Sequence, residues 1–192
     1  MSLNEDLQNK AQAIKCVIFD VDGVLTDGSL FFDNQGQEFK AFNSKDGHGI
    51  RMLIESGVEV AIITGRQSEL VKHRAENLKL SPELIYQGYR DKRPAFSDLL
   101  EKTGFSKDEI AYVGDDVIDL PVMSQVGFAI AVGDAHWFVK QQAHMTTTAL
   151  GGKGAGREAC EFILSAQDKL DDLLQNYLEQ PGAETSTVDS KA

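Results

Sequence analysis

The stretch Val17-Ile18-Phe19-Asp20-Val21-Asp22-Gly23 decides the fold of this chain. Its apolar start predicts a buried strand, and its end carries two carboxylates followed by a turn glycine. Residues two apart along a strand point to the same side, so we expect Asp20 and Asp22 to face one crevice at the strand end. Two like charges side by side are costly unless a cation or a proton neutralises them. The pair therefore indicates either a site for hydrated Mg²⁺ and a phosphate or a solvated acidic turn.

Two later strands also end in polar residues. Residues 58–63 form an apolar run that leads into Thr64, and residues 110–113 lead towards Asp115. Lys92 lies between them in the chain. In an open α/β sheet, ligands bind beyond the carboxyl ends of the strands. We therefore expect these side chains to meet the first acidic pair at one sheet edge, which favours the metal and phosphate interpretation.

With these motifs, the sequence resembles the haloacid dehalogenase superfamily of phosphotransferases. The four motifs of that superfamily are matched by Asp20-Val21-Asp22-Gly23, Thr64, Lys92 and Gly114-Asp115-Asp116-Val117-Ile118-Asp119. The resemblance extends over about residues 14–165. It implies a phosphatase site at the strand ends of an α/β fold.

Longer segments narrow the resemblance. They are Asp20-Val-Asp-Gly-Val-Leu-Thr-Asp-Gly28, Ile63-Thr-Gly-Arg66, Ala111-Tyr-Val-Gly-Asp-Asp116 and Gly151-Gly-Lys-Gly-Ala155 with Arg157-Glu158. These segments resemble the capless phosphatase family that acts on 3-deoxy-D-manno-octulosonate 8-phosphate, in the pathway to the inner sugar of bacterial lipopolysaccharide. A near relative of that family acts on sialic-acid-type 9-phosphates, so the resemblance leaves two candidate substrates.

The chemistry of phosphate monoesters assigns roles to the carboxylates. A carboxylate nucleophile divides the hydrolysis into two steps through an aspartyl-phosphate, and we expect Asp20 to be that group because it lies last on the strand. Asp22 would protonate the leaving oxygen and then deprotonate the attacking water. We expect Mg²⁺ to be held by Asp20, the backbone carbonyl of Asp22 and Asp115. Asp116 and Asp119 are expected to orient these ligands or to act as charges at a helix N-terminus.

Cationic and hydroxyl side chains are expected to hold the substrate. Thr64 and Lys92 would bind phosphate oxygens, and Lys92 would also oppose the charge of the carboxylates. Arg66 and Arg74, with Lys72 near them, form either an ordinary charged helix face or a clamp for the carboxylate of a sugar acid.

A glycine-rich segment at residues 151–156 precedes a predicted helix. Glycine allows a close backbone approach, and Lys153 and Arg157 add positive charge. The segment is either a flexible connector or a loop that closes over the substrate of its own or an adjacent subunit. Gly156 departs from the family, which often has a larger residue there.

The alternation of predicted strands and helices indicates an α/β fold. We expect a Rossmann-like three-layer sandwich with a mostly parallel sheet, a projecting β-hairpin at about 29–43 and no separate cap domain. Residues 1–180 would form one domain, and residues 181–192 lack an apolar period and are expected to be a disordered tail. The predicted helices cover residues 3–13, 47–56, 67–79, 94–102, 117–125, 135–141 and 156–178, and the predicted strands cover residues 14–19, 58–63, 84–86, 110–113, 127–132 and 143–146.

The predicted hairpin carries Phe31, Phe32, Phe39 and Phe42. These rings either pack on their own domain or form a subunit contact. We favour the contact, because the gaps between the motifs are too short for a cap domain and a neighbouring subunit would supply the missing lid. The family resemblance implies a homotetramer assembled through this hairpin.

The composition fits a cytoplasmic enzyme with a sizeable core. The chain has 192 residues, 42% of them hydrophobic, and no apolar run reaches transmembrane length or forms a signal-peptide core. The net charge of −11 argues against nucleic acid and membrane partners. Cys16 and Cys160 are expected to be buried free thiols rather than a disulfide or a metal site.

Three classes of function remain. The first is a Mg²⁺-dependent phosphatase whose partner is a small sugar-acid phosphate. The second is a haloacid dehalogenase enzyme with another substrate, such as a sialic-acid-type 9-phosphate or a phosphoglycerate. The third is a non-enzymatic scaffold that keeps the fold. Asp20, Asp22 and Asp115 are all present, which argues against the scaffold, and we favour the first class because of the longer segments that resemble the octulosonate phosphatases.

Overall fold

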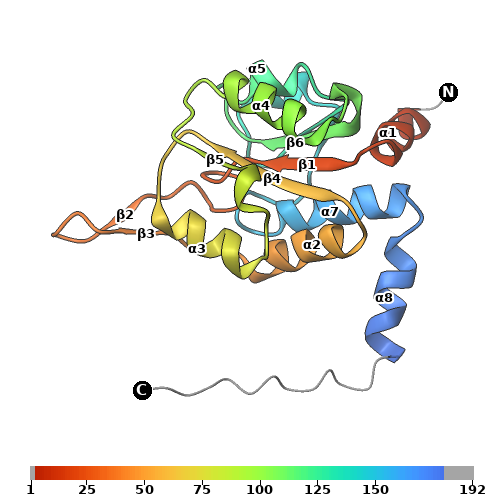
Figure 1. Cartoon of the computed structure of the whole chain (residues 1–192), viewed down its shortest axis with the longest axis horizontal. Coiled ribbons are helices and arrows are strands. Elements are labelled where there is room, and N and C mark those ends of the chain that lie inside the picture. The colour runs from red at the N-terminus through yellow and green to blue at the C-terminus, as the bar shows by residue number, and fades with distance from the viewer. Residues whose placement is uncertain (1–2, 180–192) are drawn as a thin grey trace.

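A parallel sheet forms the centre of the molecule (Figure 1), for which the computed structural model describes residues 3–179. Its strands are β1 Cys16–Phe19, β4 Glu59–Thr64, β5 Ile85–Gln87, β6 Ile110–Gly114, β7 Phe128–Ala131 and β8 Met145–Thr146. Their spatial order is β5-β4-β1-β6-β7-β8, and every neighbouring pair is parallel. The predicted α/β fold with a mostly parallel sheet is confirmed.

Strand β1 lies between β4 and β6 near the centre of the sheet. Cys16 pairs with Glu59 on one side and with Ile110 on the other. All four residues of β1 are buried, which explains the continuous apolar run, since both faces of a parallel sheet are covered. The carboxyl ends of these three strands are therefore neighbours, where sheets of this type bind their ligands.

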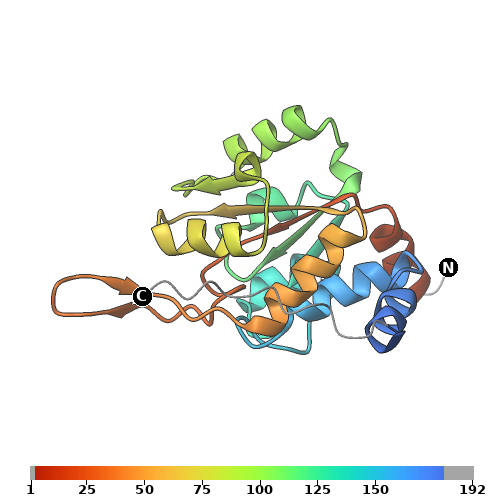
Figure 2. The same cartoon turned by 60° about the horizontal axis from the view of Figure 1, so that its bottom comes forward.

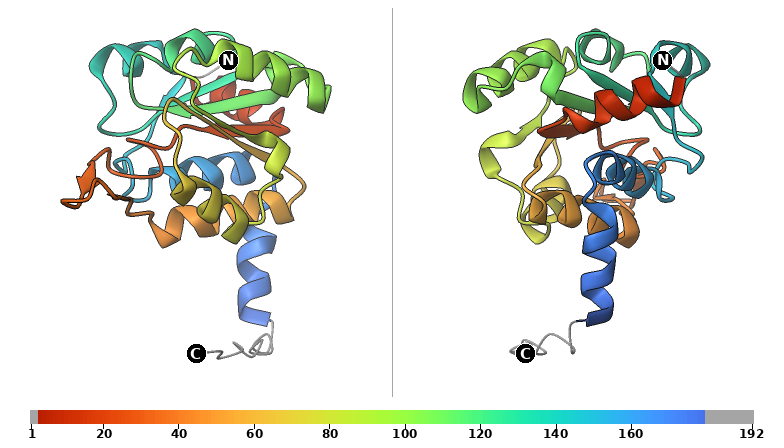
Figure 3. Two further views of the ribbon diagram at one scale, coloured as in Figure 1. Left: turned by 60° about the vertical axis from the view of Figure 1, so that its left-hand side comes forward. Right: turned by 90° about the vertical axis from the view of Figure 1, so that its right-hand side faces the viewer.

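Helices cover both faces of the sheet (Figures 1 and 3). Their bounds are α1 Leu3–Gln12, α2 Ser44–Glu55, α3 Glu69–Asn77, α4 Arg93–Thr103, α5 Leu120–Met123, α6 Trp137–Gln142, α7 Ala155–Ala166 and α8 Leu170–Glu179. Helices α2, α3 and α7 lie on one face, and α4 and α5 lie on the other. Two short 3₁₀ turns, Pro82–Leu84 and Lys107–Glu109, precede β5 and β6.

The predicted hairpin is confirmed and projects from the body of the molecule (Figure 2). It consists of β2 Phe31–Phe32 and β3 Glu38–Phe39, which pair antiparallel. Phe31, Phe32 and Phe39 are each more than half exposed. Phe42 instead packs against the main core, so three of the four rings, rather than all four, remain without cover.

One predicted helix is much shorter than expected. The pattern predicts a helix over residues 117–125, whereas α5 spans only Leu120–Met123. The carboxylate of Asp119 accepts the backbone N–H groups of Asp115 and Asp116, which holds the preceding residues in a turn. Aspartate side chains can bind backbone N–H groups and so compete with helix formation. The sequence pattern does not reveal whether the turn or the helix forms.

The predicted helical region 156–178 divides into α7 and α8. The break falls at residues 167–169, where Asp168 has a φ of 56°. Helix α8 then leaves the body of the molecule (Figure 3). No residue of α8 is fully buried, so this helix adds little to the core.

Cys16 and Cys160 are buried free thiols, as predicted. Burial raises the pKa of Cys16 to about 12, so this thiol stays protonated and unreactive. Among residues 3–179, no helix combines the length and the apolar character needed to cross a bilayer. The predicted tail at 181–192 lies outside the described residues.

Candidate active site

Asp20 lies directly after β1, at the carboxyl edge of the sheet. Its backbone N–H donates to the carbonyl of Val113 at 3.1 Å, which continues the pairing between β1 and β6. Only 4% of the residue is exposed. The backbone hydrogen bond and the burial together fix the position of Asp20, as a reacting group requires.

Lys92, the residue before α4, joins Asp20 to a buried polar network. Its Nζ lies 2.9 Å from Oδ1 of Asp20 and 2.6 Å from Oδ1 of Asp119. It also donates to the hydroxyl of Tyr112 at 2.9 Å, and that hydroxyl donates to Asp119 at 2.7 Å. Burial acts to lower the pKa of Lys92, but the two carboxylates outweigh it and raise the pKa above its ordinary value. Lys92 is therefore a buried ammonium ion.

Three carboxylates converge at this edge. Oxygens of Asp20, Asp115 and Asp119 lie within 4.8 Å of one another. Burial and then repulsion from Asp119 raise the pKa of Asp20 to about 7, against the opposing effect of Lys92. Burial and the other two carboxylates raise the pKa of Asp115 to about 8. This cluster is strained by its own charge unless protons or a cation neutralise it.

Two oxygens of the cluster fit a divalent cation. Oδ1 of Asp115 is buried and has no hydrogen-bond partner, and Oδ1 of Asp20 is buried with the ammonium of Lys92 2.9 Å away. Both oxygens of Asp119, in contrast, already accept hydrogen bonds from Lys92, Tyr112 and the backbone. Asp20 and Asp115 are therefore the carboxylates that could hold a cation, whereas Asp119 is already engaged by Lys92, Tyr112 and the backbone. Carboxylate oxygens of this kind suit Mg²⁺.

Gly23 lets Asp115 approach the turn after β1. Its φ of 94° lies in the left-handed region that favours glycine. A Cβ at this position would lie 2.2 Å from Oδ2 of Asp115. The carboxylate thus lies against the turn that carries the carbonyl of Asp22, the third predicted metal ligand.

The hairpin base positions Asp22. Because β1 ends at Phe19 and residues 21–26 form turns, the strand-alternation argument for pairing the two aspartates is wrong. The carboxylate of Asp22 instead forms an ion pair with Lys40 and lies 3.8 Å from Nε of Arg66. The side chain of Lys40 is only 2% exposed, so this pair is shielded from water.

Comparisons with known proteins define the family. A family of haloacid dehalogenase-like hydrolases matches residues 83–151. The 3-deoxy-D-manno-octulosonate 8-phosphate phosphatase of Escherichia coli is 49% identical over 170 residues, which cover 88% of this chain and 89% of the relative. The chain belongs to the haloacid dehalogenase-like hydrolases.

Solved structures place this hydrolase in the same phosphatase group. The octulosonate phosphatase of Yersinia pestis is 48% identical, with a TM-score of 0.85 over 87% of this chain and 89% of its own. That of Moraxella catarrhalis, in complex with a magnesium ion, a phosphate ion and KDO, is 40% identical. Its TM-score is 0.87 over 92% of this chain and 99% of its own. The resemblance predicted from the motifs is confirmed.

The hydrolase brings two of the remaining predicted residues to the sheet edge. Thr64 is the last residue of β4, next to β1, and is 2% exposed. Arg66 follows it and reaches the hairpin, where its Nη2 lies 2.8 Å from Oε1 of Glu38. The predicted contacts of both residues with substrate stay predictions.

Three predicted substrate ligands are engaged with other parts of the hydrolase. Arg74 donates to a backbone carbonyl at the start of α2, at 3.3 Å. Nζ of Lys153 lies 3.7 Å from Asp27, and Nε of Arg157 lies 2.6 Å from Glu161. A role of these cations in substrate binding stays a prediction.

Sequence reasoning missed Lys40 and Tyr112. Lys40 reads as an ordinary polar hairpin residue, and only the return of the hairpin brings it to Asp22. Tyr112 offered a signal, because a tyrosine inside a buried strand needs a partner for its hydroxyl. The structure supplies Lys92 and Asp119 as those partners.

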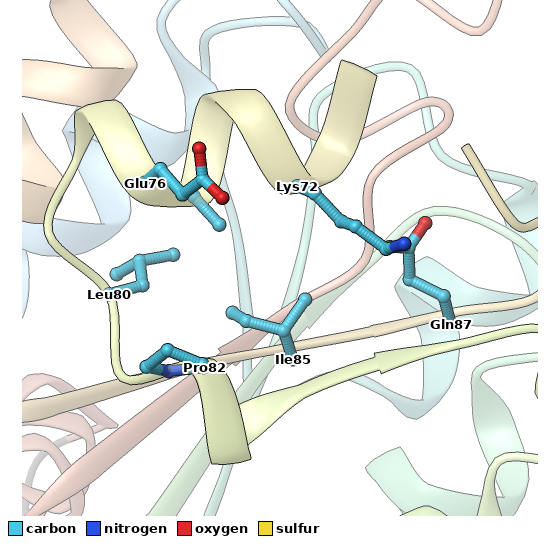
Figure 4. Close-up of a pocket in the computed structure, with 7 residues that line it drawn as sticks. Lys72, Glu76, Leu80, Pro82, Ile85 and Gln87 are labelled. Carbon is cyan, nitrogen blue, oxygen red and sulfur yellow. The ribbon is translucent and has the colours of Figure 1, made fainter. Parts of the chain in front are cut away.

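A separate pocket of about 240 Å³ lies between α3 and β5 (Figure 4). It is lined by Lys72, Ala75, Glu76, Leu80, Pro82, Ile85 and Gln87. None of the residues of the strand-end site takes part in this lining. Lys72, which was expected near the arginine pair, forms an ion pair with Glu69 at 2.6 Å instead. The chemistry of the side chains, rather than the hollow surface, locates the active site.

Proposed function

We propose that this protein is a Mg²⁺-dependent phosphatase that hydrolyses 3-deoxy-D-manno-octulosonate 8-phosphate to the free sugar acid and phosphate, in lipopolysaccharide biosynthesis. The carrying observation is the cluster of Asp20, Asp115 and Lys92 at the strand ends of a chain that is 49% identical to an octulosonate phosphatase. The catalytic carboxylates are all in place, which favours an enzyme over a scaffold.

Asp20 would attack phosphorus, and the bond between phosphorus and the sugar oxygen would break. Asp22 would give its proton to that leaving oxygen. In the second step, Asp22 would take a proton from water, and the water would attack the aspartyl-phosphate to release phosphate. The ion pair with Lys40 fixes the position of the Asp22 carboxylate in the turn that follows β1.

The cation would be held by Asp20, Asp115 and the backbone carbonyl of Asp22. Bound there, Mg²⁺ would screen the charge of Asp20 against the incoming phosphate. The buried Oδ1 of Asp115, which has no hydrogen-bond partner, and the convergence of the carboxylates of Asp20 and Asp115 support this assignment. Lys92 and Thr64 would bind phosphate oxygens, and Lys92 would keep the nucleophile in place through its contact with Asp20.

Cations outside the cluster would recognise the sugar acid. Arg66 is the first candidate for its carboxylate, because Arg66 lies beside Asp22 at the base of the hairpin. Arg74, Lys153 and Arg157 are further candidates that would need to exchange their present partners. An arginine is suited to this task because it binds a carboxylate through two parallel hydrogen bonds.

The exposed hairpin supports a homotetramer with active sites near subunit boundaries. Leu30, Phe31, Phe32 and Phe39 form a projecting apolar surface, and a neighbouring chain would bury it. Closed symmetry is the usual arrangement of such assemblies. The proposed location is the cytoplasm, where reducing conditions suit the two free thiols.

A substrate panel tests the function. The full chain is assayed with the octulosonate 8-phosphate, a sialic-acid-type 9-phosphate, 3-phosphoglycerate and p-nitrophenyl phosphate, each with Mg²⁺ and with EDTA. We expect kcat/KM for the octulosonate ester to exceed the others by about 100-fold or more, since buried polar contacts discriminate strongly. A higher kcat/KM for the 9-phosphate, or full activity in EDTA, would reject the proposal.

A further inference from the structure

The glycine-rich segment 151–154 packs against the turn that follows β1. The N–H of Gly152 donates to the carbonyl of Val24 at 2.8 Å. A Cβ at Gly151 would lie 1.8 Å from the carbonyl oxygen of Gly23. The two backbones are therefore in direct contact, so a side chain at this point would force them apart. The sequence suggested either a flexible connector or a loop over the substrate. Neither interpretation included this contact with the turn.

Two side chains at the start of α2 hold the glycine-rich segment and the beginning of α7. Nδ2 of Asn43 donates to the carbonyl of Gly152 at 3.2 Å, while its Oδ1 accepts the N–H of Lys45. Oδ1 of Asp46 accepts the N–H of Arg157, in the first turn of α7, at 2.9 Å. The segment is thus fixed on one side by α2, and it contacts the catalytic turn on the other.

Asp46 is a buried carboxylate that the proposed chemistry does not use. It is 2% exposed, and its Oδ2 has no hydrogen-bond partner. Burial raises its pKa, and the N–H groups of Arg157, Gly154 and Gly156 and the charge of Arg74 oppose that rise. A carboxylate at a helix N-terminus interacts favourably with the helix dipole. Such a costly group is kept where it fixes a particular arrangement.

We propose that Asp46 is a positioning residue for the catalytic turn, acting through α7 and the segment 151–154 on the backbone of Gly23 and Val24. Gly23 is also the point where Asp115 approaches the turn. Displacement of this backbone therefore moves the metal ligands relative to Asp20. The inference rests on the proposed phosphatase activity. It adds Asp46, where α2 contacts α7, to the residues on which catalysis depends.

The test compares Asp46→Ala with Asp46→Asn in the full chain. We expect Asp46→Ala to lower kcat by about tenfold or more, because small displacements of reacting groups are costly. The loss should be equal for the octulosonate ester and p-nitrophenyl phosphate, with KM changed by less than about twofold, since the turn serves both substrates. The Mg²⁺ concentration for half-maximal activity should rise at least about threefold. Asp46→Asn keeps an oxygen acceptor for Arg157 and should restore most of kcat.

Gln167→Ala is the matched control, at the other end of α7. Nε2 of Gln167 donates to the carbonyl of Ile14 at 2.7 Å, and Ile14 precedes β1, whereas the catalytic turn follows it. This variant should lower the melting temperature and leave kcat and the Mg²⁺ requirement unchanged. If Asp46→Ala behaves in the same way, its role is only structural and the proposal is wrong.

Two further outcomes decide the question. A loss confined to the octulosonate ester would overturn the proposal and make Asp46 part of substrate recognition. Should Asp46→Ala fail to fold, Asn43→Ala removes the hydrogen bond to Gly152 and must show the same loss of kcat on both substrates. If the wild type does not hydrolyse the octulosonate ester, the positioning role is still tested by two comparisons of Asp46→Ala with the wild type. One is kcat for p-nitrophenyl phosphate, and the other is Mg²⁺ binding measured by thermal shift.

Discussion

The strand-end site and the hairpin differ in how completely the rest of the chain covers their side chains and supplies their hydrogen-bond partners. At the strand ends, Lys92, Tyr112 and Asp119 are fully buried and hydrogen-bonded to one another. On the hairpin, Phe31 and Phe39 pair across the two strands, yet they are 53% and 55% exposed. The polar cluster at the strand ends is thus built from contacts within the chain, whereas the hairpin has an apolar surface that residues 3–179 leave uncovered.

Lys40 connects these two regions. It lies at the base of the hairpin, and its buried ammonium group contacts Asp22. Asp22, the proposed general acid, therefore depends on a segment whose outer part has no cover among the described residues. Asp20 is therefore held by contacts within the described part of the chain, whereas the position of Asp22 depends on the hairpin.

The largest expected effect comes from Asp20→Asn. It should reduce kcat by about 1,000-fold or more, because the covalent route is lost. The melting temperature at pH 8 should not fall, since one member of a crowded carboxylate cluster is neutralised. Kinetics and thermal melting measure both. Near wild-type turnover in pure Asp20→Asn protein would contradict the covalent mechanism.

Asp115→Ala tests the metal side of the same site. We expect the half-saturating Mg²⁺ concentration to rise by at least about tenfold, because one of few anionic ligands is lost. Asp116→Ala is the control: its exposed carboxylate accepts the N–H of Val117, and its removal should change the requirement less than about twofold. An equal effect of the two variants would show that Asp115 is no ligand.

The double variant Phe31→Lys/Phe39→Lys tests the hairpin. It should dissociate the oligomer in light scattering and lower kcat/KM for the octulosonate ester by about tenfold, with less than about threefold change for p-nitrophenyl phosphate. Leu178→Lys, at an 80% exposed position of α8, is the control and should leave assembly intact. If the wild type is a fully active monomer at assay concentration, the hairpin is not needed for activity and the proposed subunit contact is wrong.

The smallest effect is a pH-dependent response of stability to Mg²⁺. The pKa values of Asp20 and Asp115 rise to about 7 and about 8, so the folded protein holds these protons more tightly than the unfolded chain. Without metal, stability should therefore fall as pH rises from about 4 to about 8. Mg²⁺ replaces the protons, so its stabilising shift in melting temperature should be a few °C larger at pH 8.5 than at pH 6. Asp115→Ala should abolish that difference.

The sequence predicts the parts of the molecule that depend on local patterns. Apolar runs at 58–63 and 110–113 reveal the strands because both faces of the sheet are covered. Asp115 could then be placed near Asp20, because neighbouring parallel strands end at one edge. The contacts of Lys92 with Asp119 and Tyr112 could not be predicted from the sequence, since they depend on how α4 packs on the sheet.

Contacts between distant segments were beyond such reasoning. Asp46 meets the N–H of Arg157, 111 residues away in the chain, and no local pattern links the two. Lys40 reaches Asp22 only because the hairpin returns to its origin. The strand-alternation argument for Asp22 failed for a related reason, because the end of a strand depends on the turn that follows it.

The central position of β1 has a consequence for how the enzyme forms during synthesis. Cys16 pairs with Glu59 on one side and with Ile110 on the other, and Ile110 is synthesised much later than Glu59. A nascent chain that ends before β6 therefore has an open edge on its first strand, and Asp115, the proposed metal ligand, has not yet been made. Pairings between segments this far apart in the chain are slow to form. Catalytic competence is consequently a late event in folding, reached only when the second half of the chain has closed the sheet around the first aspartate.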